Sequence, residues 1–583
     1  MISKLQDLMK HYNINYYIIP TDDDHQSESV GEYYQVRMYL SGFKGSAGTL
    51  LVTQDQAYMW TDGRYFIQAA KELNDGIKLM KMNTEGYPSL YEFLHENVRE
   101  GDTIGFDGRV LNARAVLDLK EMFKDQVNIR SIDLITPIWV DRPPMSHSKV
   151  FLYDKKYHGK EARDKLSDIR KILKKENCDA HVLSTLDDIA YIFNIRGHDI
   201  ECTPLVLSYA LITMNDAYLY LQDDVYDETI ESFLEEQGVT IKSYYEIYED
   251  VKLLKGTILV DLANINYELV NSIPGTPKDT ENPSQYMKCI KNDVEIKNTI
   301  NAHIKDGVAV TKFMYWLKKN IGKIEMDEYS VAEYLTNLRA QQDLFIEPSF
   351  TTISAYQENA ALMHYHAEKE DATKLKEEGM LLVDSGGHYY DGTTDITRTF
   401  VLGPISDLQK KHFTIVLKAV LDLQKTHFLY GQTGVDLDVL ARNPIWCEDI
   451  DYQCGTGHGV GHLSVVHEGP NEFRPKTRYR QATVMEEGMI TTDEPGIYLE
   501  NQYGIRTENE LLCVKGTKNE YGQFMHFKCL TLVPIDLDAI DKDLLSYDEI
   551  NALNDYHKEV YETISPYLND DERIWLKEYT REI

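Results

Sequence analysis

Basic residues and cysteines are both scarce in this 583-residue chain. The sequence has 61 Lys and Arg against 95 Asp and Glu, which gives a formal net charge of −34. No basic stripe offers a surface to nucleic acid or to an anionic membrane. The seven cysteines are odd in number and include no CxxC pair, which argues against a disulfide framework and for a reducing compartment.

Long apolar runs are absent as well. No run approaches the roughly 18 residues that a membrane-spanning helix needs. Residues 1–17 have the pattern of a polar amphipathic helix followed by a strand, without the apolar core of a signal peptide. We therefore expect a cytoplasmic protein. Its apolar fraction of 43% is that of a folded globular chain, and its length predicts two to four domains.

The order of segments in the first 140 residues recurs further along the chain. Residues 4–9 correspond to 165–170, the strand-like 16–21 to 180–185, and 50–60 to 210–220. A repeat of this size predicts two copies of one α/β domain. We place them at 1–140 and 149–285, with Pro-containing linkers at 136–148 and 272–285.

The rest of the chain has a different pattern. A strongly helical run at 291–322 is followed by short strands around Gly-rich turns. This predicts a mixed α+β domain over residues 286–535. Residues 536–583 form a predicted C-terminal extension that is mostly helical and polar.

Residues 380–400 present two aspartates on neighbouring strands. An apolar run delivers Asp384 into a Gly-rich turn, a β-prone segment then presents Asp395, and Asp391 lies between them. Strand side chains alternate, so both carboxylates can enter one cavity, where they repel each other unless a cation lies between them. We interpret Asp384 and Asp395 as a metal-bridging pair. A polar hairpin with solvated aspartates is the alternative that this segment alone leaves open.

Further residues of suitable chemistry follow. Residues 454–470 place His458, His462 and His467 among glycines, and three histidines so close together favour a metal or catalytic site. Glu494 precedes a Pro-Gly turn, Glu508 lies beside Arg506, and His364 follows a loop. Either glutamate taken singly is more often solvated or salt-bridged.

Two Asp, two Glu and one His together make an oxygen-rich site for two divalent cations, with Mn²⁺ favoured over thiolate-seeking metals. His364 and His467 could donate hydrogen bonds to the oxyanion and to the leaving nitrogen.

With these motifs the chain resembles aminopeptidase P, the Xaa-Pro aminopeptidase of the methionine-aminopeptidase/creatinase superfamily, in its long three-domain form. The resemblance lies in SGFKGSAGT (41–49), WTDGRY (60–65), LDDIAYIFNIRG (186–197), KNDVEIKN (291–298) and the extension at 530–557. It implies two creatinase-like N-terminal α/β domains, a pita-bread catalytic domain and a helical C-terminal extension.

The resemblance also assigns roles to residues. The implied metal ligands are Asp384, Asp395, His458, Glu494 and Glu508, with Asp395 and Glu508 bridging the two metals. Glu494 would be the general base, and His364 and His467 would bind substrate and stabilise the transition state. Tyr498 would line the proline pocket, and Arg506 would contact substrate.

One position departs from the family pattern. Many members have a histidine four residues before His458, where this chain has Cys454. A catalytic task at this position is therefore in doubt, and Cys454 would be either a small apolar residue or an oxidation-sensitive thiol. We interpret His462 as structural.

The implied reaction removes the N-terminal residue from peptides with proline at position two, through a metal-bridging hydroxide. Two Mn²⁺ ions are expected, with Co²⁺ or Zn²⁺ as alternatives, and so is a homodimer. The rival readings are a prolidase, which cuts Xaa-Pro dipeptides, and a non-catalytic peptide- or protein-binding member of the fold. Creatinase uses the fold without metals, which the five intact ligand positions disfavour.

Overall fold

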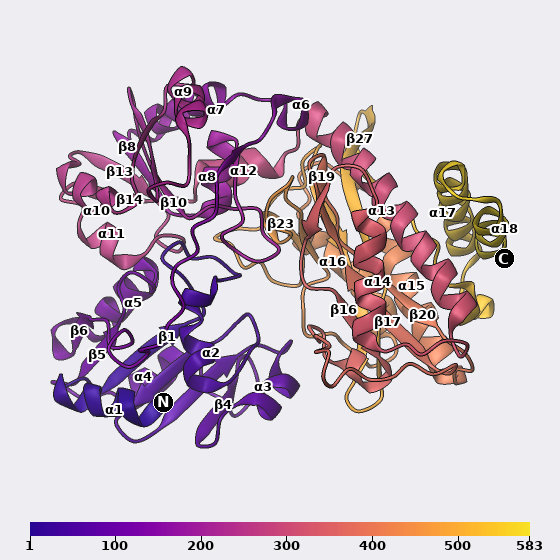
Figure 1. Ribbon diagram of the computed structural model, residues 1–583, viewed down its shortest axis with the longest axis horizontal. Coiled ribbons are helices and arrows are strands. Elements are labelled where there is room, and N and C mark those ends of the chain that lie inside the picture. The colour runs from indigo at the N-terminus through magenta and orange to yellow at the C-terminus, as the bar shows by residue number, and fades with distance from the viewer. The chain divides into compact units, whose positions relative to one another are not determined.

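The computed structural model describes residues 1–583, which form two compact units. The first unit holds residues 1–155 and 160–285, and the second holds residues 156–159 and 286–583. Figure 1 labels the elements along the chain. No helix combines the length and the apolar character that crossing a membrane requires.

The first unit contains two six-stranded sheets with the same topology. Their strand orders are β4-β3-β2-β1-β5-β6 and β12-β11-β10-β8-β13-β14. In each sheet the strand that comes first in sequence, β1 or β8, pairs antiparallel with the next long strand, β2 or β10. It also pairs parallel with a later strand, β5 or β13. The duplication predicted from the repeated segments is therefore confirmed. We propose the predicted boundaries, 1–140 and 149–285, for the two copies.

The strands of the first unit are β1 (Tyr16–Pro20), β2 (Thr49–Thr53), β3 (Ala57–Thr61), β4 (Ile77–Lys81), β5 (Thr103–Phe106), β6 (Asn128–Ser131), β7 (Phe151–Leu152), β8 (Ala180–Leu183), β9 (Ile195–Arg196), β10 (Ser208–Thr213), β11 (Ala217–Leu221), β12 (Thr240–Ser243), β13 (Thr257–Val260) and β14 (Thr276–Asp279). The first twelve helices are α1 (Ile2–His11), α2 (Val36–Ser41), α3 (Phe66–Glu72), α4 (Leu90–Asn97), α5 (Ala113–Phe123), α6 (Lys155–His158), α7 (Ala162–Glu176), α8 (Leu186–Phe193), α9 (Glu228–Glu236), α10 (Ile247–Asp250), α11 (Tyr267–Asn271) and α12 (Pro283–Cys289).

The second unit combines antiparallel sheets with long helices. Its strands are β15 (Phe345–Pro348), β16 (Ile353–Tyr356), β17 (Met380–Ser385), β18 (Gly387–Tyr389), β19 (Gly392–Thr393), β20 (Ile396–Val401), β21 (His427–Leu429), β22 (Gly457–Gly459), β23 (Glu468–Phe473), β24 (Ile490–Asp493), β25 (Gly496–Leu499), β26 (Tyr503–Arg506), β27 (Asn509–Asn519) and β28 (Gly522–Cys529). Its helices are α13 (Asp293–Asn320), α14 (Glu328–Ala340), α15 (Asp407–Gln424), α16 (Gly434–Trp446), α17 (Tyr547–Ile564) and α18 (Asp570–Tyr579).

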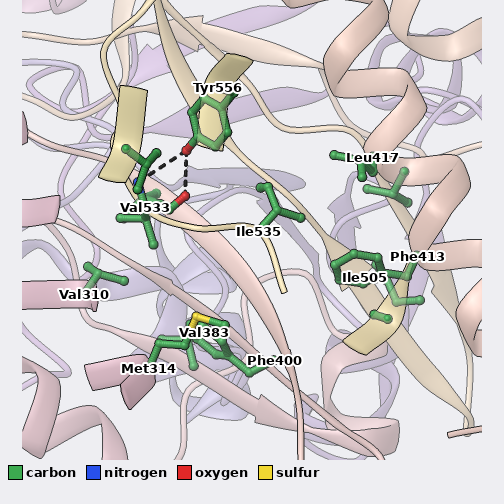
Figure 2. Packing of buried hydrophobic residues seen from close by; sticks show 14 of the residues in the cluster. Val310, Met314, Val383, Phe400, Phe413, Leu417, Ile505, Val533, Ile535 and Tyr556 are labelled. Atoms are coloured by element: carbon green, nitrogen blue, oxygen red, sulfur yellow. Dashed lines mark hydrogen bonds between the residues drawn. The ribbon is translucent and has the colours of Figure 1, made fainter. Parts of the chain in front are cut away.

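Helix α13 is the longest helix of this unit, and a capping box fixes its start. The Asn292 side chain accepts from the backbone of Glu295, and the Glu295 side chain accepts from the backbone of Asn292. Buried residues of α13, including Val310 and Met314, belong to the same apolar core as Val383 of β17 and Phe400 of β20 (Figure 2). The helical run predicted at 291–322 is thus confirmed as a core helix.

The segment between Asp384 and Asp395 is more than the Gly-rich turn that the sequence predicts. Strands β17 and β20 do pair antiparallel. The residues between them, however, form a second hairpin, β18–β19, which belongs to a different sheet with β15. Polar residues such as Thr393 and Thr394 are buried there because hydrogen bonds satisfy them, so their polarity misleads a prediction from hydrophobicity.

The C-terminal extension is held by hydrogen bonds as well as by apolar contact. The hydroxyl of Tyr556 on α17 donates to Val533 O at 2.6 Å (Figure 2). It also donates to Thr531 O at 3.1 Å. The next residue, His557, is fully buried and accepts the Ile535 N–H at 3.0 Å through Nε2. Burial lowers the pKa of His557 to about 3, so the ring is neutral in the folded protein.

This buried imidazole predicts a pH-dependent loss of stability. A histidine whose folded pKa lies below its unfolded value of about 6.5 stabilises the fold above that pH, and the contribution is lost as the pH falls. Between about pH 7.5 and pH 5, we expect the wild type to lose about 2 kcal/mol relative to His557→Gln. Urea unfolding of the two proteins at both pH values measures this difference. A constant difference would show that His557 protonates equally easily in both states.

Candidate metal centre

Five strand ends of the second unit carry the predicted ligands. Asp384 lies in β17 and His458 in β22, whereas Asp395, Glu494 and Glu508 lie just outside β20, β24 and β27. Because Asp384 pairs with Thr397 and side chains alternate, Asp395 shares the face of the sheet on which Asp384 and Thr397 lie. Residues 504–512 have a strand-like pattern that places Glu508 on a strand, whereas β27 begins one residue later, at Asn509.

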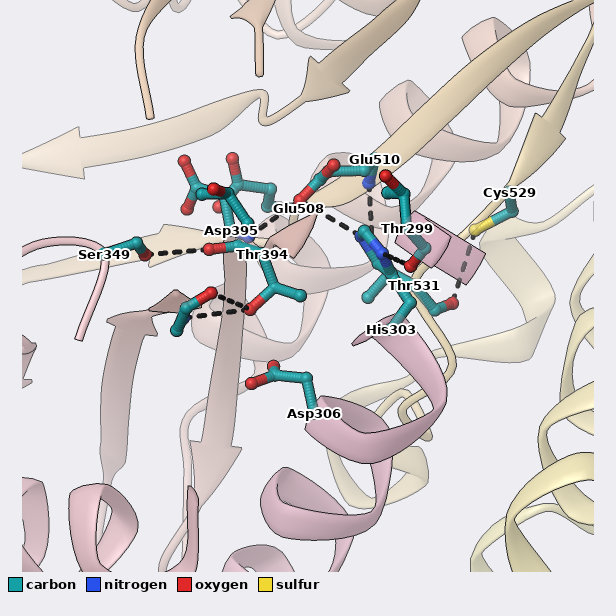
Figure 3. Close-up of polar contacts among 12 residues, drawn as sticks. Thr299, His303, Asp306, Ser349, Thr394, Asp395, Glu508, Glu510, Cys529 and Thr531 are labelled. Carbon is teal, nitrogen blue, oxygen red and sulfur yellow. Dashed lines mark hydrogen bonds and ion pairs between the residues drawn. The ribbon is translucent and has the colours of Figure 1, made fainter. Parts of the chain in front are cut away.

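The structure brings these side chains together. Nε2 of His458 lies 3.6 Å from Oδ2 of Asp395 and 3.5 Å from Oε1 of Glu494. Ligand atoms of Asp395, His458 and Glu508 all lie within 4.8 Å of one another. Oδ1 of Asp384 is buried without a hydrogen-bond partner. Figure 3 shows Asp395 and Glu508 with the polar residues that support them.

His458 is oriented for ligation by its backbone surroundings. Its Nδ1 donates to Gly459 O at 2.9 Å, which leaves the lone pair on Nε2, the nitrogen that faces the carboxylates. Its own N–H donates to Thr492 Oγ1 at 3.0 Å. Metal-binding histidines are commonly held by a hydrogen bond to the ring nitrogen that does not bind the metal, which here is Nδ1.

The carboxylates perturb one another strongly. Burial, and after it the charges of Asp384 and Glu494, hold the pKa of Asp395 well above its ordinary value. Burial and the charges of Asp395 and Asp384 do the same to the pKa of Glu508. Burial raises the pKa of Glu494 to about 7, although Arg506 opposes this. Each shift is what crowded anions show when no cation separates them.

This donor set fits divalent cations. Four carboxylates and one imidazole supply hard ligands, and the buried Asp384 oxygen is otherwise unused. Two divalent charges would offset the mutual repulsion that raises these pKa values. The residues present therefore fit a dinuclear centre.

Arg506 is the guanidinium inside this group. Its Nη2 donates to Asp384 Oδ2 at 2.5 Å, its Nη1 to the Tyr498 hydroxyl at 2.7 Å and its Nε to Thr397 Oγ1 at 3.0 Å. Thr397 Oγ1 in turn donates to Glu508 Oε2 at 2.9 Å. Only 3% of the Arg506 surface is exposed. One side chain thus ties two predicted ligands to Tyr498.

The outer histidines lie at the edge of this group. The half-buried His467 packs edge-on against His458, with ring centroids 4.3 Å apart, and its charge lowers the pKa of Glu494. His364 is also half-buried and follows Met363, whose carbonyl accepts from Arg506 at 3.5 Å. Each histidine is therefore adjacent to this group, His467 through its ring contact with His458 and His364 through its chain neighbour Met363.

Two other residues of the glycine-rich segment lie differently. His462 is buried and engages Thr299 Oγ1 and Tyr157 O, each at 3.0 Å. Cys454 packs partly buried against the apolar core, and its carbonyl accepts from Arg442. The structural role of His462 stays a prediction, and so do the two alternatives for Cys454.

Sequence reasoning missed a second layer of residues behind the ligands. Glu510 accepts the Asp395 N–H at 2.7 Å and lies near His303 of α13. Arg398 donates to Glu508 O at 2.6 Å and to Tyr556 at 2.7 Å. Period-two alternation along β27 could have indicated Glu510, which lies two residues after Glu508. No local pattern marks His303 or Arg398.

Family models match nearly the whole chain. The model of the M24 metallopeptidase family matches residues 297–515, and that of the peptidase M24 C-terminal region matches 523–583. Two models of the creatinase/prolidase N-terminal domain match residues 1–137 and 141–295. A protein of Aspergillus flavus named probable Xaa-Pro aminopeptidase P is 36% identical over 100% of this chain and 92% of its own length.

The chain belongs to the M24 metallopeptidase family.

Other relatives agree across the full length. A Coprinopsis cinerea protein, also named probable Xaa-Pro aminopeptidase P, is 35% identical over 100% of this chain and 98% of its own. The crystal structure of X-prolyl aminopeptidase from Caenorhabditis elegans, described as a cytosolic enzyme with a di-nuclear active site, superposes with a TM-score of 0.95 at 32% identity, covering 100% and 99% of the two chains. The resemblance and the fold expected from the sequence are confirmed.

Metal binding should stabilise this site measurably. We expect Mn²⁺ added to metal-stripped protein to raise Tm, because a ligand that binds only the folded state contributes about 2.7 kcal/mol at a hundredfold excess over Kd. Asp395→Asn should lose most of the increase. Differential scanning calorimetry measures both.

The matched control is Asp391→Asn in the same segment. Asp391 is buried and bonded to Asn301 and Lys305, outside the ligand set. This variant should start from a lower Tm and still respond fully to Mn²⁺. An equal response from Asp395→Asn would contradict the assignment of Asp395 as a ligand.

Proposed function

We propose that this metallo-aminopeptidase removes the N-terminal residue from peptides whose second residue is proline. The observation that carries the proposal is the convergence of Asp384, Asp395, His458, Glu494 and Glu508 on one buried space, in a chain aligned end to end with proteins named Xaa-Pro aminopeptidase P. Proline lacks an N–H and has a fixed φ, so its peptides need a dedicated site.

The five ligands would hold two divalent cations, which when bound would activate a water and polarise the scissile carbonyl. We propose that Asp384 and Asp395 hold one cation and that His458 and Glu494 complete the site of the other. Asp395 and Glu508 would be shared. The hard oxygen donors favour Mn²⁺.

Protein side chains would supply the remaining chemistry. Glu494, which is half-buried and follows the last residue of β24, would take up the proton of the attacking water. His364 and His467 would donate hydrogen bonds to the carbonyl oxygen and to the leaving nitrogen. Tyr498, half-buried and held by Arg506, would form a wall of the proline pocket.

For Arg506 we propose a different role from the substrate contact expected from the sequence. Each guanidinium nitrogen is already used, by Asp384, Tyr498 and Thr397. With 3% exposure, the side chain has little surface to offer a peptide. Arg506 would instead orient a ligand and the pocket tyrosine together.

A prolidase is the alternative function. The prolidase of Pyrococcus horikoshii, at 26% identity and a TM-score of 0.50, spans 64% of this chain but 99% of its own. This chain is longer and has two six-stranded N-terminal sheets. That additional length favours the aminopeptidase, whose relatives align over all of it.

A cytoplasmic homodimer completes the proposal. None of the seven cysteines is joined to another by a disulfide, which suits a reducing compartment. Trp446 and Val439 on α16 are 44% and 45% exposed and lie seven residues apart, on one face of the helix. Exposed apolar side chains aligned in this way suit a partner surface. Sedimentation velocity tests the dimer.

The activity is tested with Mn²⁺-loaded protein and two substrates, Arg-Pro-Pro and Arg-Pro. We expect release of free arginine from the tripeptide, dependent on metal and reduced by about 10²-fold or more in Asp395→Asn, since the bridging carboxylate is lost. Cleavage of the dipeptide alone would mean a prolidase. Bound metal without cleavage of either would contradict the substrate assignment, and absence of both metal and cleavage would favour a non-catalytic binding protein.

Arg506→Lys separates the two roles of Arg506. Lysine keeps the charge, but its donors all lie on one nitrogen and cannot reach Asp384, Tyr498 and Thr397 together, so the ligand and Tyr498 lose their common anchor. We expect kcat to fall by about 10–100-fold with KM nearly unchanged. An increase in KM with unchanged kcat, measured on Arg-Pro-Pro, would instead indicate substrate binding.

A further inference from the structure

The peptide unit that joins Thr394 to Asp395 is held at both ends. Its carbonyl, Thr394 O, accepts from Ser349 Oγ at 2.8 Å, and its N–H, on Asp395, donates to Glu510 Oε1 at 2.7 Å (Figure 3). The plane of a peptide unit is rigid, so fixing both ends holds the Cα of Asp395 in place. The pairing of the next residue, Ile396, with Ser385 limits the remaining rotation about the N–Cα bond, so the direction of the Asp395 side chain is restrained. The two bonds to this peptide unit therefore help to set the direction of the Asp395 carboxylate, which is predicted to bridge two metals.

Close packing reinforces this clamp. A Cβ added at Gly386 would lie 1.9 Å from Thr394 O and 2.2 Å from Ser349 Oγ. Only glycine permits this approach, because any side chain would displace the clamped carbonyl. The glycine-rich turn after Asp384 therefore has a packing reason.

Glu510 is itself fully buried and braced. Its Oε1 also lies 3.1 Å from Nε2 of His303 on α13, and Nδ1 of His303 donates to Thr299 O at 2.8 Å. The Glu510 N–H donates to Thr531 Oγ1 at 2.8 Å (Figure 3). Helix α13 and strand β27, about 200 residues apart in sequence, thus meet at one carboxylate.

We propose that Glu510, braced by His303, is a positioning residue that aims the Asp395 carboxylate at the metal pair. The role rests on the metal centre of the proposed function. A further carboxylate adds to the repulsion around Asp395, so its burial here is costly unless its bonds serve the site. Its second oxygen, Oε2, has no hydrogen-bond partner. Direct ligation by Glu510 is therefore the competing use.

The test compares metal affinity in Glu510→Leu and Glu510→Gln by titrating stripped protein with Mn²⁺ in a calorimeter. Leucine removes the acceptor for the Asp395 N–H, and we expect Mn²⁺ affinity to fall by about 10–100-fold. Glutamine keeps an acceptor oxygen, so we expect it to restore affinity to within about threefold of wild type. The stoichiometry should stay at two in both variants.

Asp536→Leu is the matched control. Asp536 is also buried and accepts the N–H of Val401 at 2.8 Å, at the end of β20 opposite Asp395. It also pairs with a cation, Lys318, at 2.5 Å. It touches none of the five ligands. We expect this variant to lose stability and to keep its Mn²⁺ affinity, which separates positioning from general destabilisation.

Other results would decide against the inference or against the function on which it rests. Unchanged affinity in Glu510→Leu would overturn the positioning role, and loss of one whole Mn²⁺ equivalent in both Glu510 variants would make Glu510 a ligand instead. If Glu510→Leu does not fold, Glu510→Asp withdraws the acceptor by one methylene and must show the same loss of affinity. Wild type that binds no Mn²⁺ would remove the metal centre together with this role. Wild type that binds two Mn²⁺ yet cleaves no Xaa-Pro peptide would reject the proposed function alone.

Discussion

Repulsion among buried carboxylates is the constraint on which the catalytic unit depends. Asp384, Asp395, Glu494 and Glu508 meet in one space, and two of them have pKa values raised well above normal. Two like charges about 4 Å apart cost about 4 kcal/mol at an effective dielectric constant of 20. Arg506 offsets part of this through Asp384. Divalent cations would offset the rest, so the fold holds a set of charges that a metal-free protein has no physical reason to gather.

Holding such a set requires a rigid backbone, and the second unit provides one from distant parts of the chain. Arg398 donates to the carbonyl of Glu508 and to Tyr556 of the C-terminal extension, which also binds Val533 and Thr531. A residue of the C-terminal extension therefore supports a ligand through one intermediate side chain, Arg398. The extension belongs to the machinery of the site rather than to its surroundings.

Much of the site was readable from the sequence because its residues lie in short local motifs. Asp384 and Asp395 flank a turn, and Glu494 precedes Pro-Gly, so local motifs marked each as a candidate, while the family resemblance supplied the ligand roles that we propose. The duplicated sheet was readable too, since its order repeats. The β18–β19 hairpin was missed because buried hydrogen bonds, which no hydropathy pattern shows, make its polar residues part of the interior.

The supporting residues could not be predicted, for a different reason. His303 and Glu510 acquire a role only when α13 packs against β27. The substrate contact expected for Arg506 came from the family resemblance, whereas its bonds run to Asp384, Tyr498 and Thr397. A motif supplies the identity of a group, but the direction of its bonds depends on the tertiary fold.

The central claim is that these five side chains hold two cations. The most direct measurement is anomalous X-ray diffraction from crystals soaked in Mn²⁺, recorded on both sides of the manganese absorption edge. Two anomalous peaks about 3.5–4 Å apart, both in contact with Asp395 and Glu508, are the predicted result. A single peak, or peaks away from these carboxylates, would contradict the dinuclear assignment.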